Sequence, residues 1–341
     1  MTETTHHDRE RMRRAIELAR SGPWPDPNPR VGCVIVDGNG GVVAEGWHRG
    51  AGSPHAEVAA LAVAGERARG ATAYVSLEPC AHTGRTGPCA DALVAAGVTR
   101  VVYGQADPNG IAAGGADVLR AAGIDVLPGV LAGDAAALND RWSRTVVLGR
   151  PLVTWKFAAT LDGRSAAADG TSQWITGAEA RSDVHALRAT RDAIVVGTGT
   201  VLVDDPRLTV RTTEARGSRA GQQPRRVVVG MRDVPESAKV HDAPGEVLHL
   251  RTHEPAEALS VLWDEGIRDV WLEGGPTLAA AFLSAGLVDE VYAYIAPALL
   301  GAGRNAVGDL GVPSMAEIMR FDVADVRQVG TDVRIHVLPV K

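Results

Sequence analysis

The feature that most constrains this chain of 341 residues is a set of three potential metal ligands, one histidine and two cysteines. His55 precedes a predicted helix, Cys80 follows a predicted strand, and Cys89 opens a second predicted helix. Two thiolates and one imidazole suit tetrahedral zinc, and three protein ligands leave the fourth position for water. If the three residues bind one zinc ion, the N-termini of both predicted helices lie close to the end of the predicted strand.

Glu57 lies two residues after His55, where its carboxylate can reach a metal-bound water without being a ligand. Zinc lowers the pKa of such a water from about 15.7 to about 7, and a nearby carboxylate then moves protons. We expect the positive end of the helix at Cys89 to favour the thiolate of that residue. His-x-Glu with two Pro-Cys pairs is the pattern of zinc nucleobase deaminases.

The chain departs from that general pattern in the spacing of its cysteines. Eight residues, instead of two, separate Cys80 from Cys89, and this insert is rich in hydrogen-bond donors that suit a phosphate. The alternative interpretation is a structural zinc site or unrelated buried thiols. The joint occurrence of Glu57 with both Pro-Cys pairs argues against it. Cys33, within an apolar run, is interpreted as a small buried residue.

The pattern of apolar residues predicts alternating helices and strands along the whole chain. In the first half, helices are predicted over 8–20, 56–69, 89–96, 115–122 and 134–147, and strands over 31–36, 42–46, 71–77, 99–103 and 124–127. In the second half, strands are predicted over 152–158, 193–197, 226–230, 246–250, 269–272, 290–295, 323–329 and 333–338, with helices over 178–190, 255–266 and 276–285. This alternation predicts the α/β class, with sheets that are at least partly parallel.

Gly149-Arg150-Pro151 is the best candidate for a domain boundary, because Gly and Pro both end a helix. We therefore predict two domains, 1–148 and 149–341. No internal repeat is visible, so the two domains are different. Residues 214–224 are polar and basic and predict a surface loop.

Composition restricts the classes of partner and location. The chain has 35 Lys plus Arg against 41 Asp plus Glu, a formal charge of −6, and this acidity argues against nucleic-acid binding. No apolar run approaches the ~20 residues of a membrane helix. The N-terminus lacks the apolar core of a signal peptide. We therefore expect a cytoplasmic protein that binds neither nucleic acid nor membrane.

Longer motifs resemble the bifunctional deaminase–reductase family of riboflavin biosynthesis, and the resemblance spans nearly the whole chain. In the first half the similar segments are Asn28–Val36, His55–Val58, Glu78–Cys89 and Asp107–Gly110. In the second half they are Lys156 with Leu161–Arg164, Ser172–Thr176, Val201–Thr209 and Glu273–Leu278. The long spacing between the two cysteines is typical of this family. Gly87 and Gly110 depart from it, since proline is commoner at both positions.

The resemblance implies a cytidine-deaminase-like N-terminal domain that binds zinc and a dihydrofolate-reductase-like C-terminal domain that uses NADPH. It implies zinc ligands at His55, Cys80 and Cys89 and a proton shuttle at Glu57. Further contacts to the pyrimidine or its phosphate are expected from Asn28, His48 and His82. It also implies phosphorylated pyrimidine substrates and a homo-oligomer.

In the reductase domain, glycine-rich strand ends suit an anion, although none matches the Rossmann fingerprint. By family position, NADPH contacts are expected from Ala158, Trp174, Thr200, Asp204, Gly274, Gly275, Pro276, Thr277 and Leu278. Substrate contacts are expected from Ser172, Arg188, Leu208, Arg211 and Glu273, where the two arginines suit a 5′-phosphate. Lys156, Asp204 and Glu273 are candidates for the proton donor. Arg232 follows a predicted strand, where either a 2′-phosphate contact or a solvated arginine fits.

The expected function is therefore a two-step one, deamination of a diaminopyrimidinone followed by reduction of its ribosyl group. Two other functions are compatible with parts of the sequence. One is a deaminase of RNA or nucleotides fused to an unrelated reductase, against which the acidic charge counts. The other is a zinc-binding scaffold without catalysis, against which Glu57 counts.

Overall fold

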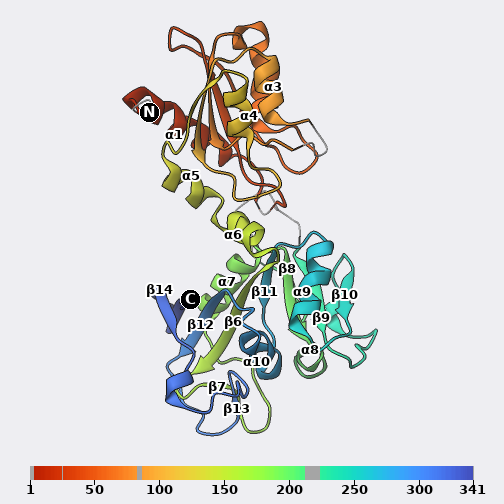
Figure 1. Cartoon of the computed structure of the whole chain (residues 1–341). Coiled ribbons are helices and arrows are strands. Elements are labelled where there is room, and N and C mark those ends of the chain that lie inside the picture. The colour runs from red at the N-terminus through yellow and green to blue at the C-terminus, as the bar shows by residue number, and fades with distance from the viewer. Residues whose placement is uncertain (1–3, 25, 83–86, 212–222, 341) are drawn as a thin grey trace. The chain divides into compact units, whose positions relative to one another are not determined.

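The computed structural model describes residues 4–24, 26–82, 87–211 and 223–340. The chain divides into two compact units, residues 1–149 and 150–341, which we call the first and the second unit (Figure 1). No helix within the described ranges is long and apolar enough to cross a membrane.

The first unit is built on one mixed sheet of five strands. These are β1 (Gly32–Val36), β2 (Val42–Trp47), β3 (Thr72–Leu77), β4 (Arg100–Gln105) and β5 (Asp125–Leu127), in the order β2-β1-β3-β4-β5. β1 pairs antiparallel with β2 and β3, whereas β3, β4 and β5 are parallel. The short connection between β1 and β2 requires antiparallel pairing, and the helical connections after β3 and β4 allow the parallel pairs.

Helices cover both faces of this sheet. They are α1 (His6–Ala19), α2 (Ala56–Ala64), α3 (Cys89–Ala95), α4 (Gly115–Ala121), α5 (Ala132–Leu138) and α6 (Asp140–Leu148). The core on one face includes Ala60 of α2, Leu93 of α3 and Leu119 of α4. The core on the other face includes Met12 of α1 and Ala135 of α5.

Two predicted helices of this unit are shorter in the structure. The helix predicted over 56–69 ends at Ala64 and continues as a 3₁₀ turn, Gly65–Ala68. The helix predicted over 134–147 is divided at Asn139 into α5 and α6. The Asn139 side chain exchanges two hydrogen bonds with the backbone of Arg30, at 2.9 and 2.8 Å. This long-range pairing holds Asn139 outside helical geometry, and sequence periodicity does not reveal it.

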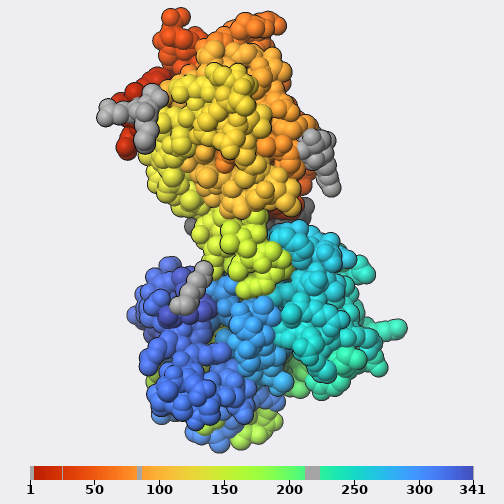
Figure 2. All heavy atoms as spheres, viewed as in Figure 1, coloured from red at the N-terminus to blue at the C-terminus, as the bar shows by residue number. Residues whose placement is uncertain are grey.

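The second unit is built on a sheet of eight strands. They are β6 (Leu152–Thr160), β8 (Ala193–Gly197), β9 (Arg225–Val229), β10 (Val247–Leu250), β11 (Asp269–Leu272), β12 (Glu290–Ala296), β14 (Phe321–Val329) and β15 (Asp332–Pro339). Their order is β10-β9-β8-β11-β6-β12-β15-β14, and all neighbours are parallel except at β15. Figure 1 shows β10 and β14, the two ends of this order, on opposite sides of the unit, and Figure 2 shows these two sides in cyan and dark blue.

Helices α7 (Ala178–Arg188), α8 (Thr198–Asp204), α9 (Pro255–Asp264) and α10 (Pro276–Ser284) accompany this sheet, and apolar clusters fill both of its faces. The sequence did not predict α8, whose glycine and β-branched residues have low helix propensity. It also did not predict the short pair β7 (Arg164–Ala166) and β13 (Arg304–Asn305), which forms only by long-range contact. Most of the predicted surface loop 214–224 lies outside the described residues.

Candidate active sites

The three predicted zinc ligands of the first unit lie together. His55 caps α2, Cys80 follows β3 and Cys89 begins α3. Their ligand atoms all lie within 4.8 Å of one another. The Nδ1 atom of His55 is 3.1 Å from Sγ of Cys89 and 3.7 Å from Sγ of Cys80. Usual zinc–ligand bond lengths place such N and S atoms about 3.5 Å apart in a tetrahedron, so the donor set fits zinc in chemistry and in spacing.

The electrostatics of the two thiols differ. The Cys89 thiol, His55 and the Cys89 backbone amide all donate toward the Cys80 sulfur and lower the pKa of Cys80 to about 4, although burial opposes this shift. The amide lies 3.4 Å from that sulfur. As the donor of the pair, Cys89 has a raised pKa. The first amide of α3 therefore stabilises the Cys80 thiolate, whereas the effect of this helix on the Cys89 thiolate stays a prediction.

Glu57 lies in the first turn of α2, only 3% exposed. Burial raises the pKa of this carboxyl to about 7, although its hydrogen bonds and the charge of His55 oppose the shift. A carboxyl that is half protonated near neutral pH can both take and give a proton. The structure thus places an acid–base group beside the three ligands.

Two of the three further residues predicted for this site lie next to it. The ring of His48 stands edge-on to that of His55, with centroids 5.6 Å apart. His48 is buried, its Nδ1 is 3.1 Å from the Pro54 carbonyl, and its Nε2 is 3.2 Å from the amide of Asn28. Asn28 and His48 therefore form one polar group beside the ligands.

His82, the third, follows Cys80 closely in the chain. Its Nδ1 is buried without a hydrogen-bond partner in the described part of the chain. Residues 83–86 of the predicted phosphate-binding insert lie outside the described residues.

Sequence reasoning did not assign a role to Glu78. Its buried carboxylate accepts backbone N–H groups of Asp107 at 3.2 Å, Gly114 at 3.2 Å and Ala116 at 3.1 Å. Glu78 thus holds the 107–116 segment against the end of β3, which precedes Cys80. The sequence feature that could have indicated this role is the position of Glu78 directly before Pro79-Cys80.

Gly115→Ala is expected to disturb the ligand segment. A Cβ at Gly115 would lie 1.7 Å from the carbonyl oxygen of Pro79, so α4 or the Pro79–Cys80 segment has to move. Such overpacking costs about 3 kcal/mol. We expect a lower melting temperature of the first unit and a lower zinc-to-protein ratio by atomic absorption. Gly133→Ala is the matched control because nothing lies within 4 Å of its Cβ position. Equal zinc contents and melting temperatures in both variants would refute the packing argument.

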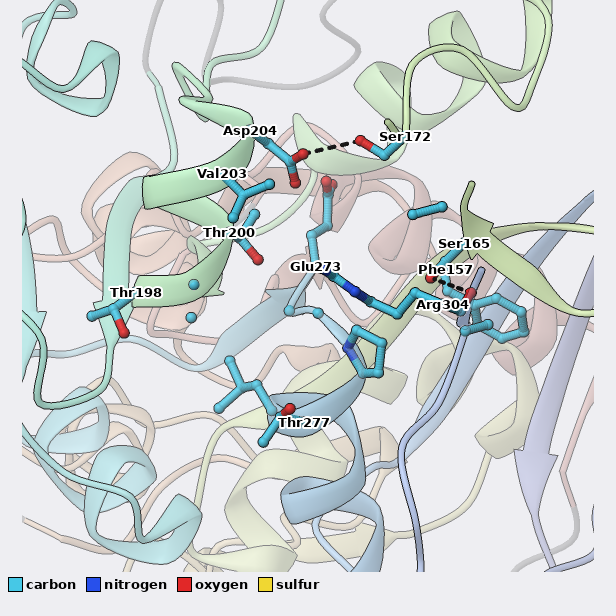
Figure 3. A pocket seen from close by; sticks show the side chains of 18 of the residues that line it. Phe157, Ser165, Ser172, Thr198, Thr200, Val203, Asp204, Glu273, Thr277 and Arg304 are labelled. Carbon is cyan, nitrogen blue, oxygen red and sulfur yellow. Dashed lines mark hydrogen bonds between the residues drawn. The ribbon is translucent and has the colours of Figure 1, made fainter. Parts of the chain in front are cut away.

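The second unit contains a cavity of about 960 Å³ at the carboxyl ends of its central parallel strands. All residues predicted to contact NADPH line it: Ala158, Trp174, Thr200, Asp204, Gly274, Gly275, Pro276, Thr277 and Leu278. Figure 3 shows Thr200, Asp204, Glu273 and Thr277 grouped around one space, although they come from different elements. The cavity has room for a ligand of the size of a dinucleotide.

Glu273 lines this cavity and is held by three donors. Arg188 forms a bidentate ion pair with its carboxylate, and the indole N–H of Trp271 donates to the same group. Burial opposes ionisation, but Arg188, Lys156 and Trp271 together lower the pKa of Glu273 to about 2. Glu273 is therefore a carboxylate at neutral pH and an acceptor, not a proton donor.

Lys156 lines the same wall of the cavity. Burial lowers the pKa of its ammonium group, Glu273 raises it, and Arg188 lowers it further. Asp204 is engaged elsewhere, because its carboxylate accepts a hydrogen bond of 2.9 Å from Ser172 (Figure 3). Of the three predicted proton-donor candidates, Lys156 is the amine, and its lowered pKa favours the release of a proton.

Three of the predicted substrate residues, Arg188, Leu208 and Arg211, do not line the cavity. Leu208 is 4% exposed and belongs to a hydrophobic cluster. Arg211 is exposed, and its guanidinium lies 3.3 Å from Nε2 of His185. The sequence analysis assigned no role to His185, which lies three residues before Arg188 on α7. Burial and the charges of Arg188 and Arg211 lower the pKa of His185 to about 4, although the Glu273 carboxylate opposes the shift.

Comparisons with known proteins agree with these two sites. Residues 5–105 match the family model of the cytidine and deoxycytidylate deaminase zinc-binding region. Residues 151–335 match the model of the RibD C-terminal domain, which covers more than half of the chain. The riboflavin biosynthesis protein RibD of Mycobacterium tuberculosis is 52% identical over 92% of this chain and 91% of its own length. The chain belongs to the RibD family.

Solved structures of the family are similar along the whole chain. RibD of Acinetobacter baumannii has a TM-score of 0.84 at 42% identity, covering 98% of this chain and 99% of its own. A Thermotoga maritima diaminohydroxyphosphoribosylaminopyrimidine deaminase/5-amino-6-(5-phosphoribosylamino)uracil reductase has a TM-score of 0.77 at 33% identity, with the same two coverages.

Membership of the RibD family confirms the predicted fold and activities. The chain is a bifunctional enzyme of riboflavin biosynthesis, with a zinc-dependent deaminase and an NADPH-dependent reductase. The first unit is cytidine-deaminase-like and the second is dihydrofolate-reductase-like. The interpretation of the cysteines as unrelated thiols is excluded, as is a scaffold without catalysis.

Proposed function

We propose that the first unit deaminates 2,5-diamino-6-ribosylamino-4(3H)-pyrimidinone 5′-phosphate and that the second reduces the ribosyl group of the product to ribityl. The observation that carries this proposal is the pairing of a zinc-type donor set and buried Glu57 with a separate cavity lined by all predicted NADPH contacts. The two activities in the name of the T. maritima relative support the same proposal.

In the first site, His55, Cys80 and Cys89 would hold the zinc. Zinc supplies an acidified water at neutral pH. Glu57 takes the proton of the water that adds to C2 of the pyrimidinone and passes it to the departing amino group, which leaves as ammonia. Asn28 and His48 lie beside His55 and orient the pyrimidine or its phosphate, with His82 as a further contact.

In the second site, the Gly274–Leu278 turn with Ala158, Trp174, Thr200 and Asp204 would hold NADPH. NADPH supplies hydride to C1′ of the opened ribosyl chain, and the nitrogen on C1′ then takes a proton. We assign this proton to Lys156, because Glu273 is held as a carboxylate and Asp204 accepts from Ser172. Ser172 and Glu273 line the cavity and are proposed to contact the substrate. Arg211 is proposed to bind its phosphate, whereas Arg188, which pairs with Glu273, and the buried Leu208 are proposed to position the groups that do.

Lys156→Met is expected to slow NADPH oxidation about 100-fold, the lower range for the loss of a general acid. NADPH binding, measured by fluorescence titration, should change little. Lys239→Met is the control, since Lys239 is exposed and paired with Asp205 at 3.0 Å. A Lys156→Met enzyme with a normal turnover number would remove Lys156 from the proton pathway.

The proposed function is tested with the purified zinc-loaded chain and the diaminopyrimidinone substrate. Ammonia release followed by NADPH oxidation is expected. Ammonia without NADPH oxidation would refute the proposed reduction, whereas ammonia from a polynucleotide but not from the pyrimidine would favour the rival RNA or nucleotide deaminase. The homo-oligomeric state and the cytoplasmic location stay predictions, and sedimentation analysis and cell fractionation test them.

A further inference from the structure

The cavity of the second unit extends to the carboxyl ends of β9 and β10, where the proposed chemistry uses none of its lining residues. Those residues are Gly230, Met231, Arg232, Thr252 and His253. The sheet order separates β9 and β10 by β8 from β11 and β6, the strands that lead to Glu273 and carry Lys156. A dinucleotide whose nicotinamide lies near Lys156 and Glu273 therefore reaches toward β9 with its adenosine end.

Arg232 is the arginine that lines the cavity near the carboxyl end of β9. It makes no hydrogen bond or ion pair with any residue in the described part of the chain. The neighbouring acid, Asp233, is instead paired with Arg251 at 2.6 Å. Arg251 also donates a hydrogen bond of 3.1 Å to the Met231 carbonyl. It therefore holds the residues on both sides of Arg232 in place. Among the described residues, none supplies a paired counter-charge to the guanidinium of Arg232, although the segment that carries it is held in place.

The position of Arg232 relative to α8 directs it to the cavity. A Cβ at Gly199 would lie 2.9 Å from Nη2 of Arg232, so the guanidinium rests against the backbone that opens α8. The absence of a side chain at Gly199 makes this approach possible. Gly199 and Thr200 line the cavity beside Arg232, and Thr200 is one of the proposed NADPH contacts.

We propose that Arg232 binds the 2′-phosphate on the adenosine ribose of NADPH and thereby makes the reductase prefer NADPH over NADH. A guanidinium binds phosphate oxygens in a bidentate manner, and this phosphate is what distinguishes the two cofactors. The inference rests on the proposed NADPH site and adds the residue that determines its specificity.

Titration calorimetry on the full chain tests the assignment without turnover. The probes are adenosine 2′,5′-bisphosphate, which carries the 2′-phosphate, and adenosine 5′-monophosphate, which lacks it. Arg232→Ala is expected to weaken binding of the bisphosphate about 10- to 100-fold, the range for one charged hydrogen-bonded contact, and to leave the monophosphate unchanged. Arg232→Lys should recover part of the loss. In turnover, kcat/KM should fall for NADPH and not for NADH.

A control variant and three contrary results complete the test of Arg232. Arg327→Ala removes another exposed arginine of the same unit, one that pairs with Asp325 on β14, and should change neither affinity. Equal losses for both nucleotides would overturn the assignment, because Arg232 would then serve the shared part of the ligand. Unchanged affinity for both would overturn it as well. A wild-type chain that binds neither nucleotide and oxidises no NADPH would refute the proposed cofactor site itself.

Discussion

Glu57→Gln is expected to abolish deamination while the protein keeps its zinc. Glutamine has nearly the same shape as glutamate but cannot take a proton from water, and loss of a general acid–base group costs up to about 10⁴-fold in rate. The ligand atoms are Nδ1 of His55 and the sulfurs of Cys89 and Cys80, which lie 3.1 and 3.7 Å from it. Glu57 contributes none of them, so the affinity for zinc should be retained. The measurement is ammonia release together with the zinc-to-protein ratio.

The second unit provides an internal control for this variant. NADPH oxidation should proceed at the wild-type rate when the deaminated intermediate is supplied. All residues that line the reductase cavity lie between positions 156 and 306, in the second unit, whereas Glu57 lies in the first. Glu66→Gln is the matched variant, since Glu66 is exposed and lies in the 3₁₀ turn that follows α2. Loss of zinc from Glu57→Gln would mean that Glu57 is a ligand and that its assigned role is wrong.

Cys80→Ser is expected to remove zinc from the purified protein. Even the loss of a group that merely supports a ligand weakens metal binding by about 10- to 100-fold, and the loss of the ligand itself should exceed this. Serine is a poor replacement because zinc binds cysteine as a thiolate, whereas a serine hydroxyl stays protonated at neutral pH. Deamination should disappear with the metal, and added zinc should restore little of it.

Cys33→Ala is the matched control for this experiment. Cys33 is the third free cysteine, it is fully buried in β1, and it is not part of the ligand cluster. Its replacement should leave zinc content and ammonia release near the wild-type values. Near-stoichiometric zinc in Cys80→Ser, measured by atomic absorption, would contradict the ligand assignment.

The sequence by itself indicated the zinc-type donor set of the first site and most of the elements that carry both sites, whereas the reductase residues followed from the family resemblance. Ligand types, the acid two residues from His55, and apolar periodicity are local properties of the chain, so they can be read without a structure. The strands β8 and β11 lie where they were predicted, and α3 begins at Cys89 as expected.

Tertiary structure decided the contacts between residues far apart in sequence. Glu273 is held as a carboxylate by Arg188, 85 positions away, and Asn139 divides a predicted helix by binding the backbone of Arg30, 109 positions away. The same is true of the Cys89 amide, which donates to the sulfur of Cys80, nine positions away. Propensity and spacing describe only near neighbours, whereas burial and charge pairing depend on which distant segments the fold brings together.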